Sequence, residues 1–326
     1  MLKPHTGPAV LLGIDTEADD QWSERGRREM NVRNAERLPA LQRRFDALGI
    51  RPCYLVTHEM ATRKSSAAVL RELRAGGGCE IGTHLHPWSS PPFRPEDLDA
   101  HTYPHNLPQE LLERQIEELT HTIESQLGVR PTSYRAGRNG FDGGTLAVLE
   151  RLGYTVDTSV DPLFNERRKG GMSFPGAPLV PYHPGAGDVT RPGSSSLLEI
   201  PISASTLPAL PKPLEALYAR LPPLPWRGAL KRLRLRAVWL RPSYSSLIDM
   251  QAFATRLAAA QVPCFNIIFH SSELLPGGSP YTPDEASVVR FIDDLVRLLE
   301  YLTRDLGGRG ATYAEFATGY AATARA

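Results

Sequence analysis

Residues 9–20, AVLLGIDTEADD, decide the fold, because an apolar run ends there directly in a group of acids. Residues 9–14 have the continuous apolar character of a buried strand. The acids that follow are Asp15, Glu17, Asp19 and Asp20. A strand that is buried along its length and charged only at its carboxyl end is typical of a parallel sheet covered by helices.

The rest of the chain repeats this unit. Further strands are predicted at residues 52–57, 79–83, 133–134, 154–160, 197–202 and 263–269. Helices are predicted between them by apolar spacing, at residues 35–48, 66–75, 108–127, 144–152, 248–260 and 283–306. Alternating strands and helices imply right-handed crossovers and a parallel sheet. About seven such units favour an α/β barrel over an open doubly wound sheet, so we expect one barrel domain over residues 1–326.

Composition and missing motifs exclude several classes of protein. The 326 residues hold 37 Lys and Arg against 36 Asp and Glu, a net charge of +1, so nothing indicates nucleic-acid binding. Neither a G-x-G-x-x-G after the first strand nor a P-loop motif occurs. Three widely spaced cysteines predict neither a disulfide framework nor a cysteine-based zinc site. Without a signal peptide or an apolar span in the sequence, we expect a cytoplasmic protein.

One segment departs from this balance. Residues 211–241 hold eight basic residues against the single acid Glu215, a net charge of +7 that leaves −6 for the remainder. Proline, leucine and two tryptophans are interleaved with the charges. We expect residues 205–245 to form a basic insertion on the barrel rim. A contact with anionic lipid, or with a lipid-linked phosphate-bearing substrate at the inner face of the membrane, is the alternative use of residues 211–241.

Ionisable side chains collect at the predicted strand ends. Those side chains are Asp15, His84, His86, Arg135, Asp157 and His270, with Arg138 close behind Arg135. The carboxyl ends of parallel strands line the mouth of an α/β barrel, where enzymes of this architecture have their active sites. Each residue alone is weak evidence, but their shared position predicts one site.

The pair His84-x-His86 predicts a metal site. Side chains two residues apart on a strand point the same way, so both imidazoles can face one ion. Two histidines and one carboxylate are a common ligand set for a divalent ion, with zinc the expected ion here. The carboxylate would come from Glu17, Asp19 or Asp20.

With these motifs in order, the chain resembles the polysaccharide deacetylases with a NodB homology domain, carbohydrate esterase family 4. The family motif T-F-D-D is similar to G-I-D-T-E-A-D-D, and H-[ST]-x-x-H resembles E-I-G-T-H-L-H-P-W. R-x-P-Y is similar to S-Y-R-A-G-R, and the last strand resembles F-N-I-I-F-H. The resemblance covers about residues 9–320 and implies a distorted (β/α)7–8 barrel.

The resemblance also implies roles. Asp15 matches the general base, Arg135 the arginine that orients it, and His270 the catalytic acid. Two metal ligands of the family are absent. Thr16 occupies the position of the second aspartate of T-F-D-D, and Trp88 occupies the position of the second histidine, four residues after His84. An acid after Thr16, together with His86, would then have to replace them.

Around this centre, Trp88, Arg138 and Asp157 are expected to bind the substrate. The activity implied is metal-dependent removal of an N-acetyl or N-formyl group from an amino-sugar-containing saccharide, or from a lipid- or nucleotide-linked precursor.

Two alternatives stay open. A glycosidase could use Asp15 and Glu17 as its paired carboxylates, although the histidines would then have no function. A carbohydrate-binding or scaffold protein on a degenerate barrel would explain the departures at Thr16 and Trp88.

Overall fold

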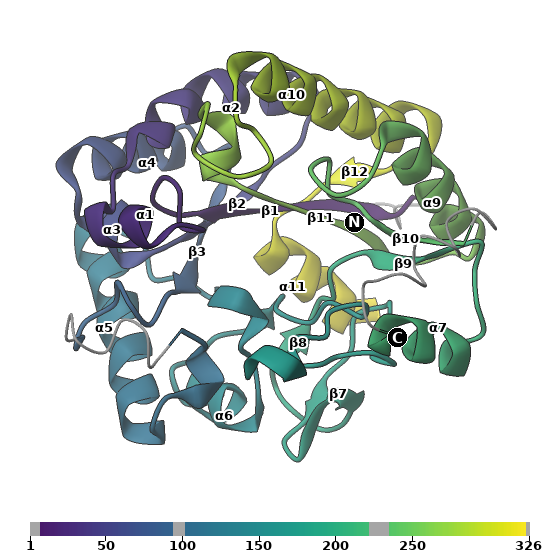
Figure 1. Cartoon of the computed structure of the whole chain (residues 1–326), viewed down its shortest axis with the longest axis horizontal. Coiled ribbons are helices and arrows are strands. Elements are labelled where there is room, and N and C mark those ends of the chain that lie inside the picture. Colours follow the sequence, from purple (N-terminus) through teal and green to yellow (C-terminus); the bar gives the residue numbers. More distant parts are fainter. Residues whose placement is uncertain (1–6, 94–101, 222–234, 324–326) are drawn as a thin grey trace.

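A parallel sheet, curved into a distorted barrel, forms the centre of the molecule (Figure 1). The computed structural model describes residues 7–93, 102–221 and 235–323. The strands along the sheet, in spatial order, are β11 (Cys264–His270), β1 (Ala9–Thr16), β2 (Cys53–Val56), β3 (Glu80–Leu85), β4 (Ser133–Ala136), β5 (Val156–Asp157) and β8 (Leu198–Glu199). The short β12 (Arg309–Gly310) also pairs with β1, and every pairing within this sheet is parallel. The predicted α/β barrel is therefore confirmed.

Helices cover the outside of the sheet. They are α1 (Glu24–Glu29), α2 (Leu38–Ala47), α3 (His58–Thr62), α4 (Lys64–Ala75), α5 (Gln109–Leu127), α6 (Gly143–Arg151), α9 (Leu247–Ala259) and α10 (Glu285–Glu300). Apart from α1, which has no apolar side chain, their apolar faces pack against the alternate strand residues that point outward, such as Val10, Leu12 and Ile14 of β1. Because side chains of a strand alternate between its two faces, Leu11, Gly13 and Asp15 point into the barrel.

The last helix, α11 (Tyr313–Thr323), fills the inside of the barrel rather than covering its outside. In Figure 1 it lies within the curve of the sheet, between β1 and β8. Tyr313 is buried with Leu11, Cys53 and Val156, and Phe316 packs against the same cluster. A barrel of this size needs side chains to fill it, and α11 supplies them from one end.

The gap between β8 and β11 is bridged by hydrogen bonds of Asn266, made by both its side chain and its backbone. The amide nitrogen of Asn266, in β11, donates hydrogen bonds to the carbonyl oxygens of Ile200 (2.8 Å) and Pro201 (3.1 Å). The backbone nitrogen of Ser203 also donates to the Asn266 carbonyl oxygen, at 3.1 Å. These bonds replace a strand ladder, and they explain why the predicted strand at residues 197–202 is reduced to Leu198–Glu199.

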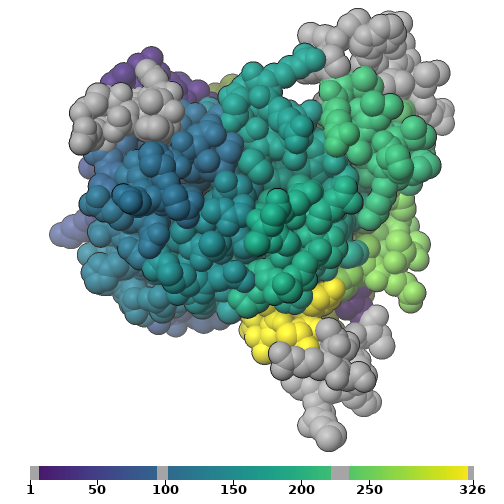
Figure 2. All heavy atoms as spheres, turned by 90° about the horizontal axis from the view of Figure 1, so that it is seen from below, coloured from purple at the N-terminus to yellow at the C-terminus, as the bar shows by residue number. Residues whose placement is uncertain are grey.

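The chain between β5 and α9 forms a layer at one side of the barrel. It includes the hairpin of β6 (Pro184–Gly185) and β7 (Asp188–Pro192), the antiparallel pair β9 (Ala204–Leu207) and β10 (Arg236–Trp239), and α7 (Lys212–Arg220). Figure 2 shows this stretch in teal and green, between the blue first half of the chain and the yellow α11.

The expected basic insertion at residues 205–245 falls within this layer, and much of the basic segment lies outside the described residues. In its described part, Leu214 and Leu217 of α7 are about half exposed. Arg241 is buried and so does not belong to a basic surface. The contact with anionic lipid stays a prediction. None of the helices in the described ranges is both long and apolar enough to span a bilayer.

Most predicted elements differ from the structure only at their ends. The helix predicted at residues 35–48 starts at Leu38 after a 3-10 turn, and the one at 283–306 is α10 followed by a π turn. Asp284 caps α10 by accepting from the backbone nitrogen of Ser287. The short α3, α7 and the antiparallel pairs were not predicted, because none has a long periodic pattern.

Below the barrel mouth, β5 and β8 place two acids side by side. Asp157 and Glu199 are register partners, and both are fully buried. Asp157 accepts hydrogen bonds from the Ser159 backbone nitrogen (2.9 Å) and hydroxyl (2.7 Å). Burial, and next the negative charge of Asp157, raises the pKa of Glu199 well above its usual range. Glu199 therefore keeps its proton in the folded protein.

The contribution of Glu199 to the free energy of unfolding is therefore expected to fall as the pH rises. A glutamic acid in the unfolded chain loses its proton near pH 4.3, whereas folded Glu199 holds its proton to higher pH, so folding is favoured less above pH 4.3. Glu199→Gln has no proton to lose. We expect its free energy of unfolding in urea to exceed that of the wild type at pH 8 and the excess to shrink towards pH 4. Each unit of pKa shift contributes about 1.4 kcal/mol. The exposed Glu72→Gln is the control, and equal pH dependence of Glu199→Gln and wild type would contradict the expectation.

Candidate active site

A cavity of about 370 Å³ opens at the carboxyl ends of the strands. Inward-facing residues of β1, β3, β4 and β11 form its floor, since each strand places its last inward side chain there. These are Asp15, His84, Arg135 and His270. The strand ends that the sequence predicted to share a site thus meet in one cavity, with the exception of Asp157.

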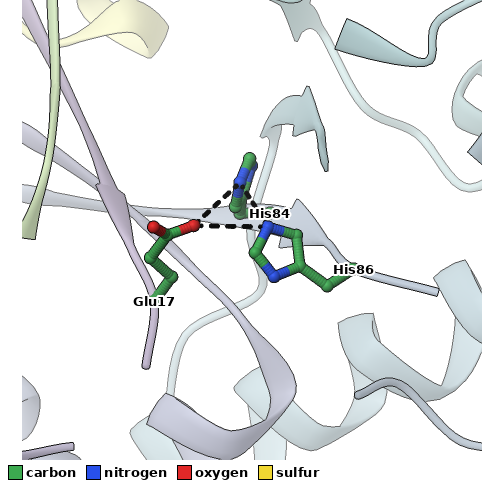
Figure 3. Close-up of side chains that lie close together, drawn as sticks. All are labelled: Glu17, His84 and His86. Atoms are coloured by element: carbon green, nitrogen blue, oxygen red, sulfur yellow. Dashed lines mark hydrogen bonds and ion pairs between the residues drawn. The ribbon is translucent and has the colours of Figure 1, made fainter. Parts of the chain in front are cut away.

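Glu17, His84 and His86 converge at one side of this floor (Figure 3). His86 Nε2 lies 3.1 Å from His84 Nε2 and 3.3 Å from Glu17 Oε2, and the His84 Nε2 to Glu17 Oε2 distance is 4.0 Å. All three side chains are at most 3–4% exposed. Three buried ligand atoms therefore face a common point.

The two imidazoles are prepared as neutral ligands. His84 Nδ1 donates a hydrogen bond to the carbonyl oxygen of Arg135 at 2.9 Å. The proton is therefore on Nδ1, and the lone pair of Nε2 points towards Glu17. Burial lowers the pKa of His84, and burial followed by the charges of His84 and His270 lowers the pKa of His86 well below its usual range. The ring of His86 is held by stacking on Trp88, at a centroid distance of 4.2 Å. Neutral imidazole is the form that binds a metal.

Glycine at position 137 makes room for this histidine. A Cβ atom there would lie 2.6 Å from His86 Cδ2 and 2.4 Å from the Leu85 carbonyl oxygen. Any larger residue would displace either the ring or the strand end.

The surroundings of the Glu17 carboxyl group disfavour its negative charge. Burial, and then the charges of Asp15 and Glu59, raises its pKa well above the usual range. Within the described part of the chain, no lysine or arginine pairs with it. Its backbone is fixed by Ser271 Oγ, which accepts from the Glu17 nitrogen at 3.1 Å, and by Asn34, which donates to its carbonyl oxygen at 2.9 Å. The acid is thus held in place where a positive charge would stabilise it.

The three atoms fit a divalent ion. Zinc binds nitrogen and oxygen at about 2.0–2.2 Å in a tetrahedron, which separates neighbouring ligand atoms by roughly 3.3 Å. The observed separations of 3.1, 3.3 and 4.0 Å bracket that value. Three protein ligands leave the fourth position for water or substrate, as in catalytic rather than structural sites.

Of the three acids considered as ligands, Glu17 is the one that lies beside the histidines. The Asp19 carboxylate instead accepts from Arg33 and from the Asn34 backbone and side chain, at 2.7–3.3 Å. Asp20 accepts from the Ser23 hydroxyl. Both aspartates shape the loop after β1, and neither lines the cavity, so we no longer assign them to the metal.

Asp15 lies between a buried arginine and a histidine. Arg135 NH1 donates to its Oδ1 at 2.6 Å, and His270 Nε2 lies 3.5 Å from its Oδ2. Burial alone would raise the pKa of Asp15, but the charge of Arg135, followed by those of His84 and His270, lowers it to about 2. Asp15 is therefore ionised throughout the physiological range.

The guanidinium of Arg135 is fixed on all sides. Its Nε donates to the Thr158 carbonyl oxygen at 3.0 Å, and its NH2 donates to the hydroxyls of Thr158 (3.2 Å) and Tyr313 (3.0 Å). Gly13 gives it space, since a Cβ there would lie 2.6 Å from NH2 and 2.3 Å from the Tyr313 hydroxyl. A single orientation of the arginine follows.

The structure adds two residues that sequence reasoning did not assign to the centre, Glu273 and Arg241. Glu273 Oε1 lies 3.0 Å from His270 Nδ1 and accepts from Arg241 NH2 at 2.6 Å, while its other oxygen accepts from Ser243. Burial opposes ionisation, but the charge of Arg241 and the contact with His270 lower the pKa of Glu273 to about 2. The spacing His270-x-x-Glu273 was the available signal. Nothing in the sequence singled out Arg241 from its basic segment.

The three residues expected to bind substrate have different positions. Trp88 and Arg138 line the cavity, and Trp88 Nε1 donates to Gln21 at 2.9 Å. Asp157 does not reach the cavity, because its side chain lies on the outer face of the sheet, buried against Ser159 and Glu199. The expectation for Asp157 is therefore corrected.

Comparison with solved structures identifies the fold. A structure from Mycobacterium smegmatis whose name assigns it as a polysaccharide deacetylase matches with a TM-score of 0.56 and 14% identity, over 99% of this chain and 94% of that one. A 4-alpha-glucanotransferase from Thermococcus litoralis matches with a TM-score of 0.50 and 14% identity, over 95% of this chain and 40% of that one.

The chain therefore has the deacetylase-type barrel fold that its motifs predicted, and a glucanotransferase has a similar barrel. No protein-family model and no curated protein matches the sequence. Since unrelated activities can share one fold, the choice between chemistries rests on the side chains in the cavity.

The position of Arg135 can be tested through Gly13. In Gly13→Ala the new methyl group would overlap Arg135 and Tyr313, so we expect a loss of about 1–3 kcal/mol in the free energy of unfolding. The control is Gly319→Ala in α11, where a Cβ meets no atom within 4 Å and helix propensity predicts a gain of up to about 1 kcal/mol. Unchanged urea stability of Gly13→Ala would show that Arg135 does not need this space.

The metal ligands can be tested by titration. We expect zinc added to the metal-depleted protein to raise its melting temperature, and Glu17→Gln to weaken the calorimetric zinc affinity at least about 100-fold, beyond the usual effect of a residue that only supports a ligand. Asp20→Asn is the matched control from the same acidic loop. Equal zinc affinities for Glu17→Gln and wild type would remove Glu17 from the site.

Proposed function

We propose that the protein is a metal-dependent hydrolase that removes an N-acyl group, acetyl or formyl, from an amino-sugar-containing saccharide. The observation that carries this proposal is the convergence of two neutral histidines and Glu17 beside an ionised Asp15, with His270 next to it. An amide is a poor electrophile and water a poor nucleophile, so its hydrolysis needs an activated water, a base and an acid held together.

Glu17, His84 and His86 would hold the ion, which we propose to be zinc. When bound, such an ion supplies a Lewis acid that lowers the pKa of water and polarises a carbonyl oxygen. The carboxylate of Asp15 lies beside this site, with its Oδ2 4.0 Å from His84 Nε2. A water molecule and the substrate carbonyl would meet at the side towards Asp15.

Asp15 would act as the base. Arg135 keeps its carboxylate ionised and fixes one oxygen, so that Oδ2 remains to take the proton as the water oxygen adds to the carbonyl carbon. Arg135 makes four hydrogen bonds, to Asp15, Thr158 and Tyr313, and would act by positioning Asp15.

His270 would act as the acid. With Nδ1 turned to Glu273, its proton-bearing Nε2 would face the reacting nitrogen. When the carbon–nitrogen bond breaks, that proton passes to nitrogen, which leaves as a neutral amine, and the acyl group leaves as a carboxylate. Glu273 would hold His270 in this orientation through Nδ1, and Arg241 and Ser243 hold Glu273 in place.

A saccharide fits the cavity walls. Trp22, Trp88, Tyr103, Tyr244 and Tyr281 line the cavity above the floor. Aromatic rings with a few polar groups between them are the usual lining of a small-molecule site. We also propose a cytoplasmic location and a lipid- or nucleotide-linked precursor, whose anionic carrier would suit the +7 charge of residues 211–241.

The two other readings predict different products. A glycosidase that used Asp15 and Glu17 would release reducing sugar, but Glu17 already faces both histidines. A non-catalytic carbohydrate-binding protein would bind sugar without turnover. Acetate or formate release without new reducing ends would exclude both.

The proposal is tested with a panel of N-acetylated and N-formylated amino sugars and oligosaccharides. We expect the release of acetate or formate to stop with chelator and return with zinc. His270→Gln is expected to lower kcat about 10²- to 10⁴-fold with little change in KM, because the acid acts only as the bond breaks.

The exposed His121→Gln on α5 is the control for this substitution. Activity that survives complete removal of metal, or a His270→Gln variant with the wild-type kcat, would refute the mechanism.

A further inference from the structure

Arg138 is the one basic residue at the cavity wall that no acid neutralises within the described chain. The other basic residues that line the cavity each pair with an acid: Arg135 with Asp15, Arg241 with Glu273 and Lys169 with Glu166. Arg138 is exposed, and within the described residues its guanidinium contacts the rings of Trp88 and Tyr103. Its positive charge therefore faces the space that a substrate enters.

The side chain is nevertheless held in place. Its guanidinium carbon lies 5.0 Å from the ring centroid of Tyr103 and 5.9 Å from that of Trp88, which are cation–π distances. These contacts restrict the rotation of a long side chain and reduce the entropy lost when it binds a ligand.

The backbone at this point is strained. Arg138 (φ 52°) and Asn139 (φ 55°) both have left-handed backbone angles, which cost non-glycine residues free energy. The Asn139 side chain fixes the turn by donating to the Ser159 carbonyl oxygen at 2.7 Å. The turn thus directs Arg138 to the cavity in spite of the free-energy cost of its two left-handed backbone angles.

Arg138 lies close to the proposed metal site. Trp88 stacks on His86 at 4.2 Å and contacts Arg138 at 5.9 Å, so the guanidinium carbon is within about 10 Å of the His86 ring. One or two sugar units span such a distance. A group bound to Arg138 would therefore belong to the unit that carries the reacting amide or to its neighbour.

We propose that Arg138 binds an anionic group of the substrate, a carboxylate or a phosphate carried by the saccharide. This inference rests on the proposed function and adds the charge class of its substrate. A guanidinium binds either anion through two parallel hydrogen bonds. The aromatic wall would hold the sugar, and Arg138 would select the charged sugar over the neutral one.

The test is direct binding to the full chain after chelator treatment, so that neither turnover nor a metal contributes. The calorimetric probes are N-acetylglucosamine, its 1-phosphate and 6-phosphate, and N-acetylmuramic acid, which carries a carboxylate. We expect at least one charged sugar to bind about 10- to 100-fold more tightly than N-acetylglucosamine, the range for a charge-assisted contact. The phosphate and carboxylate probes distinguish the two sources of charge.

Arg138→Gln is expected to abolish this preference, with a far larger loss of affinity for the charged sugar than for N-acetylglucosamine. Arg138→Lys, which keeps the charge but not the paired donors, should keep part of it. The control is Arg43→Gln on the exposed face of α2, which should bind like the wild type.

Three results would overturn the inference: no binding of any charged sugar, equal binding of charged and neutral sugars, or an equal loss for both in Arg138→Gln. Failure of the proposed function is a separate result. A protein that prefers charged sugars but releases no acyl group would keep this inference and lose the hydrolase.

Discussion

The buried ion pair between Arg135 and Asp15 is the interaction on which the centre depends. Two opposite charges removed from water are stable only with good geometry and full hydrogen bonding. Thr158 and Tyr313 supply the remaining acceptors for the guanidinium, and Gly13 leaves the space that it occupies. Loss of one partner would leave an uncompensated buried charge, at a cost of about 3–5 kcal/mol. The pair is thus both a structural element of the barrel and the support of the proposed base.

The three acids of the centre differ in ionisation because their surroundings differ. Asp15 and Glu273 each contact an arginine and are ionised, whereas Glu17 has no such partner and lies against neutral imidazoles. A polypeptide can hold an unbalanced carboxylate at such a point only by protonating it or by binding a cation. Under the proposed function, Glu17 would be available for an ion, Asp15 for proton transfer and Glu273 for the support of His270.

Much of this arrangement could be predicted from the sequence, because strand ends are easy to locate and parallel strands bring them together. Asp15, His84, Arg135 and His270 needed only that rule. The spacing of the acids did not show that Glu17 rather than Asp19 lies beside the histidines. That depends on the loop after β1, in which Arg33 and Asn34 hold the Asp19 carboxylate. Asp157 was misplaced because it pairs with Tyr134 and alternates with the inward-facing Val156, so its side chain lies on the outer face of the sheet, away from the cavity. Arg241 was hidden because its sequence neighbours are basic and its acid lies on another segment.

The position of α11 has a consequence for how the chain folds. Tyr313 of this helix touches Arg135, and β1 at the start of the chain pairs with β11 near its end. Contacts between distant parts of a sequence form late and slowly. A ribosome-bound chain that still lacks its last helix would have neither a filled barrel nor a fixed arginine. Asp15 therefore gains its supporting arginine only when residues far apart in the sequence have come together.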